Sequence, residues 1–183
     1  MPLYNSNISW GWPAVILHWL SACMVIFLFL FGLWMVGLDY YHSWYNTAPY
    51  LHKSIGITLF MVTIIRLFWR TLEPAPESIN SHSAFEIKLA RIMHFLIYVL
   101  LFCIMFSGYL ISTADGRSIE VFKMVEIPAI IYGIEHQEDI AGIIHLSLAI
   151  GLIGLVCIHA GAAIKHHFID KDQTLKRMLI KYH

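Results

Sequence analysis

The chain has 183 residues, of which 58% are hydrophobic and 13% are charged, and its formal net charge is zero. A soluble domain carries about 25% charged and about 45–50% apolar residues, so this composition predicts a protein whose solvent is lipid. The neutral total charge gives no sign of a nucleic-acid or other polyanionic partner.

Four apolar stretches follow one another along the chain, each near or above the roughly 20 residues that a helix needs to cross the bilayer. They are expected at about residues 12–38, 52–69, 89–112 and 140–164. A helix satisfies its own backbone hydrogen bonds in lipid, so the sequence predicts an all-α, four-helix integral membrane bundle forming one domain, 1–183. The first stretch lacks a preceding basic segment and is long enough to span, which favours a retained helix over a cleaved signal peptide.

The connections between these stretches are polar. Pro49 is expected just ahead of the second helix, Glu73–Ser81 forms a proline-bearing loop, and the connection from Thr113 to Asp139 is long and charged. The cysteines lie inside apolar runs without a haem-attachment motif, so they are interpreted as small buried hydrophobic side chains. They are Cys23, Cys103 and Cys157.

Lysine and arginine are distributed unequally between the two sides of the predicted membrane. One side carries Arg66, Arg70, Lys88, Arg91, Lys165, Lys171, Lys176, Arg177 and Lys181, and the other carries Lys53, Arg117 and Lys123. Cytoplasmic loops are enriched in these residues, so both termini and the middle loop are predicted to be cytoplasmic. The connections after the first and third helices are predicted to face outward.

Five of the 11 histidines lie within or at the edge of the apolar stretches, where ionisable residues are uncommon and often functional. They are His18, His52, His94, His145 and His159. His145 and His159 are separated by 14 residues, which puts both on one helix face about 21 Å apart. Histidines at the same predicted depth in the membrane can face one another. His18 is therefore paired with His159 near the inner edge, and His52 with His145 near the outer edge.

Histidine is a common axial ligand of haem iron, so these pairs predict two b-type haems, each held between two imidazoles. Two imidazoles fill both axial positions, which favours electron transfer over oxygen binding. Gly32 and Gly108 each follow one of the span histidines by 14 residues, and Gly56 follows His52 by one turn. Small residues there suit a flat macrocycle, although ordinary small-residue helix packing explains them equally well.

The fifth histidine, His94, has several open roles. It could replace His18 as the inner ligand, line a quinone site together with Arg91, or make a structural hydrogen bond. His166 and His167 are interpreted as interfacial. The remaining histidines are expected in loops or tails, namely His42, His82, His136 and His183.

Three basic residues are candidate partners of haem propionates. Arg66 lies 14 residues after His52, on the cofactor face at the inner level, where a propionate or a lipid phosphate would suit it. Lys53 and Arg117 are candidates for the same contact at the outer haem.

Several segments around these histidines are specific. They are ILHWL around His18, LHKSIG around His52, RLFWR, and the C-terminal block from HLSLA at His145 to IHAGAAIKHHFIDKDQTLKRM. Through them nearly the whole chain resembles the bacterial cytochrome b561 family. The resemblance implies four helices, two haem b groups held by His18, His52, His145 and His159, and contact with the quinone pool.

The expected function is therefore that of a di-haem membrane cytochrome in a bacterial inner membrane, as part of a respiratory chain. It would exchange electrons with ubiquinone or another quinone and with an unknown donor or acceptor at the outer face. Membrane lipid surrounds it, and a homodimer is compatible with this class, although no residue demonstrates one.

Three different functions stay open beside this one. The family resemblance includes superoxide oxidases, which pass electrons from superoxide to ubiquinone. A surface that collects superoxide should be cationic, whereas the outer segments carry three basic residues against seven acidic ones. The acidic residues are Asp39, Asp115, Glu120, Glu126, Glu135, Glu138 and Asp139. The second function is that of a cytochrome b anchor subunit of a dehydrogenase or hydrogenase, and the third is that of a histidine-using transporter, which the lack of repeats disfavours.

Overall fold

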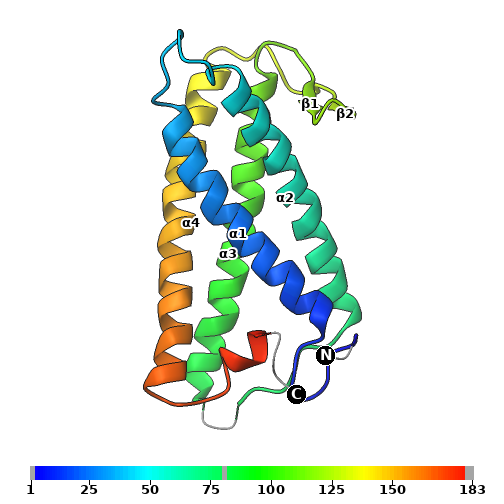
Figure 1. Ribbon diagram of the computed structural model, residues 1–183, viewed down its shortest axis with the longest axis vertical. Helices are drawn as coiled ribbons and strands as arrows, with labels where there is room; N and C mark the ends of the chain where they lie inside the picture. Colours follow the sequence, from blue (N-terminus) through cyan, green and yellow to red (C-terminus); the bar gives the residue numbers. More distant parts are fainter. Residues whose placement is uncertain (1–2, 80–81, 180–183) are drawn as a thin grey trace. The chain divides into compact units, whose positions relative to one another are not determined.

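The computed structural model describes residues 3–79 and 82–179, and four long helices dominate this part of the chain (Figure 1). Ser81, Lys181 and His183, which entered the sequence interpretation, lie outside the described residues. The elements in chain order are α1 (Trp12–Met35), α2 (Thr47–Leu72), α3 (Ala84–Thr113), β1 (Ile119–Val121), β2 (Val125–Ile127), α4 (Gln137–Phe168) and the 3-10 helix η1 (Lys176–Met178).

All four α-helices are long and apolar enough to cross a membrane. The predicted helical fold class with four membrane-spanning segments is therefore confirmed, whereas the cytoplasmic placement of the termini stays a prediction. α1 ends at Met35 rather than at residue 38, and the other three helices extend beyond their predicted bounds at both ends. Hydropathy detects only the part of a helix that lies in hydrocarbon, so polar turns at the ends were not included.

The starts of two helices explain these extensions. Ser83 and Glu86 form a reciprocal cap: the Glu86 N–H donates to Ser83 Oγ (3.2 Å), and the Ser83 N–H donates to Glu86 Oε2 (2.9 Å). This arrangement satisfies amide groups that the first turn leaves unpaired, so α3 begins at Ala84. Pro49 lies within the first turn of α2 and not ahead of it, which is tolerated because amides there have no partner within the helix.

The chain divides into two compact units, each of which contains part of every α-helix. Unit 1 comprises Met1–Ala22, Val62–Tyr98 and Gly154–His183, and unit 2 comprises Cys23–Met61 and Val99–Ile153. The expectation of one domain, 1–183, stays a prediction.

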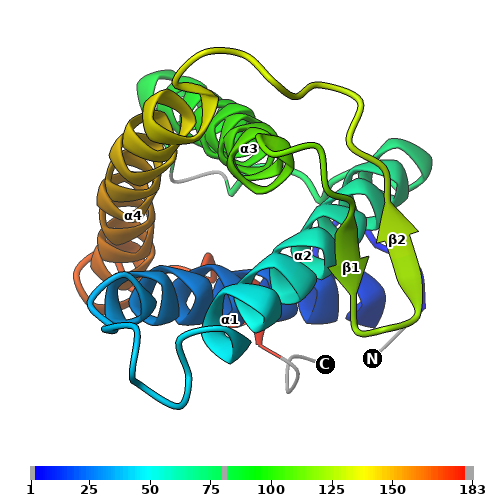
Figure 2. The ribbon, with the colours of Figure 1, turned by 90° about the horizontal axis from the view of Figure 1, so that it is seen from above.

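In unit 2, a short antiparallel hairpin of β1 and β2 interrupts the connection between α3 and α4, where the sequence predicted no strand. It lies beside α2 (Figure 2). The buried Ser54 of α2 holds it there, because its Oγ donates to the Glu120 carbonyl (3.5 Å) and accepts from the Phe122 N–H (3.3 Å).

Gln137, the first residue of α4, fastens the rest of this connection. Its buried side chain donates from Nε2 to the carbonyls of Leu110 (2.9 Å) and Ile131 (3.2 Å). Its Oε1 accepts from the Ile134 N–H (3.3 Å). One side chain therefore joins the end of α3, the connection and the start of α4.

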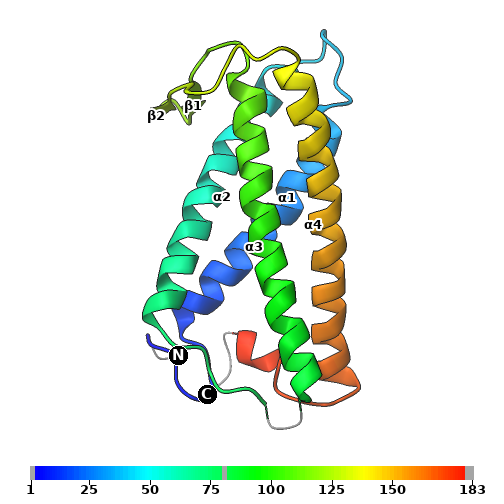
Figure 3. The same ribbon diagram turned by 180° about the vertical axis from the view of Figure 1, so that it is seen from behind.

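In unit 1, hydrogen bonds join the N- and C-terminal segments to α1 and to the segment that follows α2. The backbone N–H of Asn5 donates to Glu73 (3.2 Å), and Arg177 donates to the Glu77 carbonyl (2.7 Å). Trp19 of α1 donates from its indole nitrogen to the Met178 carbonyl (2.7 Å). The C-terminal segment with η1 thus packs within this unit (Figure 3).

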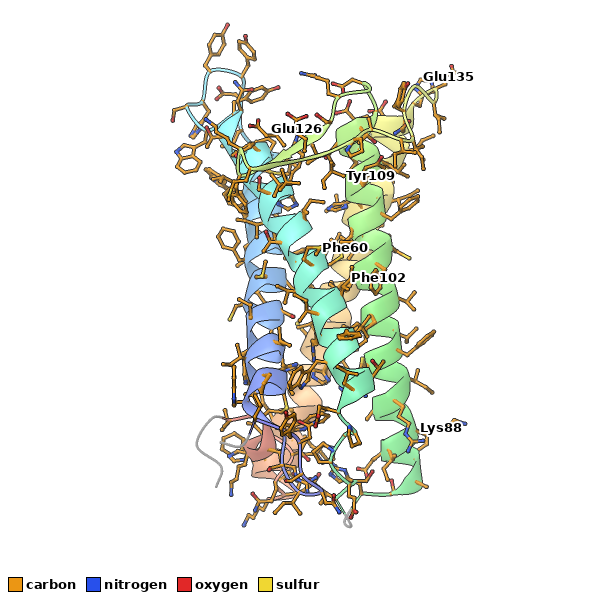
Figure 4. The ribbon with its side chains drawn as sticks, turned by 90° about the vertical axis from the view of Figure 1, so that its right-hand side faces the viewer. Phe60, Lys88, Phe102, Tyr109, Glu126 and Glu135 are labelled. Carbon is orange, nitrogen blue, oxygen red and sulfur yellow. The ribbon has the colours of Figure 1, made fainter. Side chains whose placement is uncertain are left out.

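Apolar packing between helices is modest, as expected where lipid covers the outside. In unit 2, Phe60 of α2 and Phe102 of α3 meet edge to face with ring centroids 5.9 Å apart (Figure 4). The three cysteines, expected to be buried, are instead exposed at Cys23, Cys103 and Cys157. An apolar side chain on a membrane helix can face lipid and need not be covered by protein.

Gln137→Ala should lower the stability of the protein by roughly 1–3 kcal/mol, because the Leu110 carbonyl loses its side-chain donor and the Ile134 N–H loses its acceptor. Thermal unfolding in detergent would measure this loss. Glu138→Ala, at the adjacent exposed position of the same helix turn, is the matched control and should leave stability almost unchanged. Equal effects of the two substitutions would contradict the role assigned to Gln137.

Candidate functional site

Unit 1 brings together three of the membrane histidines. The ring of His18, on α1, lies with its centroid 6.3 Å from that of His159, on α4, at an interplanar angle of 68°. The ring of His94, on α3, lies closer to His159, at 5.2 Å. His159 therefore has two neighbouring imidazoles at different distances.

Unit 2 brings together the remaining two membrane histidines with nearly the same geometry. The ring centroids of His52, on α2, and His145, on α4, are 6.3 Å apart, at an interplanar angle of 69°. The structure thus forms both histidine pairs that depth matching suggested, one within each unit. Helix α4 contributes one imidazole to each pair.

The 6.3 Å separation is informative about metal binding. A metal–imidazole bond is about 2.0–2.1 Å long, and the bonded nitrogen lies about 1.1 Å from the centre of its ring. Two imidazoles that bind one metal from opposite sides therefore have ring centroids roughly 6.2–6.4 Å apart. Both pairs have this separation, whereas His94 and His159 are about 1 Å closer. Aromatic rings without a metal also pack at about 4.5–7 Å, so the repeated value carries more weight than either distance alone.

Hydrogen bonds orient the His145 ring. Its Nδ1 lies 3.0 Å from the Ile104 carbonyl and 3.1 Å from Ser107 Oγ. A carbonyl only accepts, so Nδ1 carries the hydrogen and the lone pair is on Nε2. Metal-bound histidines are typically held in this way by a carbonyl or carboxylate on the opposite ring nitrogen. His52 Nδ1 is buried and has no hydrogen-bond partner.

Two glycines make room for the rings of unit 2. A Cβ atom added at Gly32 would lie 3.1 Å from Cε1 of His52, and one added at Gly108 would lie 3.1 Å from Cε1 of His145. Gly56, by contrast, has nothing within 4 Å of such an atom. The sequence interpretation related these glycines to a macrocycle; the contact that the structure gives to Gly32 and Gly108 is with the imidazoles.

Arg66 contacts a histidine and not a carboxylate. Its Nη2 lies 2.7 Å from His18 Nδ1, and its guanidinium carbon lies 5.6 Å from the centre of the Tyr98 ring. Guanidinium groups only donate, so in this arrangement His18 Nδ1 accepts and its Nε2 carries the hydrogen. Arg66 therefore controls the tautomer of His18.

The remaining basic residues predicted for the site lie apart from these contacts. Lys53 is half-buried next to His52 in the chain, and Arg91 is exposed on α3. Arg117 is exposed and paired with Asp115, its Nε donating to Oδ2 at 2.6 Å. The side-chain hydrogen bond from Arg117, followed by its backbone N–H, holds the pKa of Asp115 below its usual value.

Sequence reasoning missed two features. Ser107 was not singled out, although it lies one residue before Gly108 on the face of α3 that meets His145. His82, expected in a loop, and His166, expected at the interface, meet Asp172 in a cluster of potential metal donors. No sequence pattern near these residues indicated either feature, because Ser107 is 38 residues from His145 and His82 is 90 residues from Asp172.

Comparison with known proteins identifies one family. A family model described as prokaryotic cytochrome b561 matches residues 9–181. Cytochrome b561 homolog 2 of Escherichia coli K12 is 48% identical over 181 residues, covering 99% of this chain and 96% of that protein.

More distant relatives cover the chain almost as fully. Cytochrome b561 homolog 1 of Escherichia coli K12 is 27% identical over 90% of this chain and 93% of its own length. A protein of Yersinia pestis named probable superoxide oxidase CybB is 28% identical over 90% of this chain and 92% of its own length.

Gly108→Ala should be less stable than Gly142→Ala by about 1–3 kcal/mol, because its methyl group would lie only 3.1 Å from Cε1 of His145, so the ring would have to shift by a few tenths of an ångström. Gly142, on α4, has nothing within 4 Å of an added Cβ and is the matched control. Thermal unfolding in detergent would compare the two variants. Equal stability would show that the ring accommodates the methyl group without cost.

Proposed function

Because the chain belongs to the prokaryotic cytochrome b561 family, we propose that it is a di-haem b-type cytochrome that exchanges electrons between membrane quinone and a partner at the outer face. Family membership over residues 9–181 confirms the resemblance noted in the sequence. Together with four helices able to span a membrane, it identifies a multi-pass protein of the bacterial inner membrane. The observation that carries the finer proposal is the pair of equal 6.3 Å histidine separations.

The residues present fit two haems. Each pair offers two imidazoles from different helices, and these residues would hold the iron of one haem. Haem b, when bound, supplies one-electron redox chemistry, while the protein supplies ligation, orientation and local charge. In unit 2, the Ile104 carbonyl keeps the hydrogen of His145 on Nδ1, which leaves Nε2 available as the ligand atom.

At the unit 1 site, we assign His18 and not His94 as the partner of His159. The 6.3 Å separation of His18 from His159 suits coordination of one metal by both rings, and the 5.2 Å separation of His94 does not. His94 is then available beside the pair, where it could hydrogen-bond a quinone oxygen. The exposed Arg91, one turn earlier on α3, is retained as a second candidate for that site.

Arg66 fits a role as propionate partner. If His18 bound iron through Nε2, its hydrogen would move to Nδ1, which could then no longer accept from Arg66. The guanidinium, now 2.7 Å from that nitrogen, would be released for an acceptor with negative charge. A carboxylate is the partner that matches its planar donors best. Lys53 and Arg117 stay weaker candidates at the unit 2 site, because Arg117 already has the Asp115 carboxylate.

Helix α4 provides the connection between the two proposed haem sites. His145 and His159 lie on this one continuous helix, 14 residues apart, which corresponds to about 21 Å of helix rise. Each is paired within its own unit. Each of the two proposed sites would therefore take one ligand from the same helix. A transporter mechanism is not supported by family membership, and an anchor-subunit role would require co-purification with a dehydrogenase.

His145→Ala should lower the haem content from two to one per chain, and His18→Ala should do the same. His94→Ala is the matched control for His18→Ala in unit 1 and should retain two haems. Haem quantification with a reduced-minus-oxidised visible spectrum would measure these contents on purified protein. Wild-type protein without haem, from haem-replete cells, would end the cytochrome proposal. Loss of one haem in His94→Ala but not in His18→Ala would reassign the ligand.

Superoxide oxidation is the second candidate, favoured by the name of the Yersinia pestis relative. The connection between α3 and α4 argues against it, because acidic residues such as Glu126 and Glu135 are exposed there (Figure 4) and Arg117 is paired with Asp115. An acidic surround repels an anionic substrate.

Ubiquinol should reduce the oxidised wild-type protein under anaerobic conditions, whereas enzymatically generated superoxide should not speed its reduction. The visible haem spectrum would follow both reactions, with superoxide dismutase added as the control for superoxide itself. Dismutase-sensitive reduction of wild type that is absent in His145→Ala would instead establish superoxide as the donor. Failure of ubiquinol to reduce either haem would contradict the quinone proposal.

A further inference from the structure

The geometry points to a second kind of metal site in unit 1, for a divalent ion of the zinc class, formed by His82, His166 and Asp172. Its donors are His82 Nε2, His166 Nδ1 and Asp172 Oδ2, which all lie within 4.8 Å of one another. His82 precedes α3, His166 is in the last turn of α4, and Asp172 follows α4. The site is distinct from the histidine pairs and does not depend on haem.

The donor distances suit tetrahedral coordination. Zinc bonds of about 2.0–2.1 Å place neighbouring ligand atoms roughly 3.3 Å apart. His166 Nδ1 is 3.4 Å from Asp172 Oδ2, and His82 Nε2 is 2.7 Å from the same oxygen. Side-chain movement of about half an ångström would therefore bring these atoms to the distances that coordination requires.

Asp172 is buried and the two histidines are largely covered, and one histidine nitrogen makes no hydrogen bond of good geometry. The Asp172 side chain is 6% exposed and that of His166 is 14% exposed. His166 Nδ1 is buried without a hydrogen bond, although Asp170 Oδ2 lies 2.7 Å away and Asp172 Oδ2 lies 3.4 Å away. His166 Nδ1 therefore faces two carboxylate oxygens at ion-pair distance but donates a well-aligned hydrogen bond to neither of them. A cation shared by the three residues would give this nitrogen a ligand bond in place of its poorly aligned contacts.

Neighbouring contacts orient the carboxylate. Asp172 Oδ1 accepts from the Thr174 N–H (2.8 Å), so Oδ2 is the atom that faces the histidines. Such outer contacts are typical of ligands whose orientation is fixed before the metal binds. A pocket lined by His82, Glu86, Lys165 and Asp170 shares His82 with the cluster.

The donor set selects the class of ion. Two imidazoles and one carboxylate suit zinc and similar transition metals, whereas calcium and magnesium prefer oxygen ligands alone. Asp170 Oδ2 is a further donor beside His166, and its own pairing with Lys165 (2.7 Å) offsets part of the negative charge. A bound ion would join the segment before α3, the end of α4 and the C-terminal segment.

The test is metal content and stability of the purified haem-loaded protein in detergent, prepared without a polyhistidine tag. After incubation with zinc sulfate and dialysis, elemental analysis should find one tightly held zinc ion per chain. His82→Gln and Asp172→Asn should each weaken zinc binding by at least about 10-fold. A chelator should lower the melting temperature of the wild type but not that of Asp172→Asn, because only the wild type has the ion to lose.

His136→Gln is the matched control, because His136 also lies near two carboxylates, Glu135 and Asp139, but is 69% exposed. It should retain wild-type zinc affinity. An unchanged haem spectrum in every variant would verify folding. Equal zinc retention by wild type and Asp172→Asn, or equal loss in His136→Gln, would overturn the assignment. If one ligand variant does not fold, the other still gives the comparison.

Discussion

Each histidine pair takes one imidazole from α4 and the other from a different helix, and both pairs have ring centroids 6.3 Å apart. Much of the local structure follows from keeping the rings at that distance. In unit 2, α1 and α3 approach the rings through Gly32 and Gly108, where a Cβ atom would lie only 3.1 Å from an imidazole carbon. The Ile104 carbonyl then fixes which nitrogen of His145 carries the hydrogen. The glycines and the Ile104 carbonyl thus act on the same two rings, those of His52 and His145.

The two pairs differ in the groups that contact their outer nitrogens. His145 faces a carbonyl and a hydroxyl, whereas His18 faces the permanently charged Arg66. A carbonyl acceptor increases the electron donation of an imidazole to a metal, while a nearby cation stabilises added negative charge. Two haems held in these sites would have different reduction potentials, because the Ile104 carbonyl lies behind one ligand and the Arg66 cation stays near the other site even after its release from His18.

Most of the helical fold could be predicted because its signals are local. Four apolar stretches specified four helices, and histidines stood out within them because ionisable groups are costly in hydrocarbon. The hairpin of β1 and β2 could not be predicted. Its turn places Phe122 and Lys123 at φ of 49° and 58°, which normally calls for glycine or asparagine. Contacts with Ser54, more than 60 residues earlier, compensate for a turn that the local sequence disfavours.

The same reasoning explains why the pairs were predicted and the cluster of His82, His166 and Asp172 was not. Periodicity along α4 relates His145 to His159 within a single helix, so their common face can be calculated from spacing alone. His82 and Asp172 are 90 residues apart and lie outside the α-helices, where polar residues carry no cost that would mark them. Their chemistry becomes visible only when folding leaves His166 Nδ1 buried beside two carboxylates. The meeting of these three side chains is a property of the tertiary structure, and no sequence pattern encodes it.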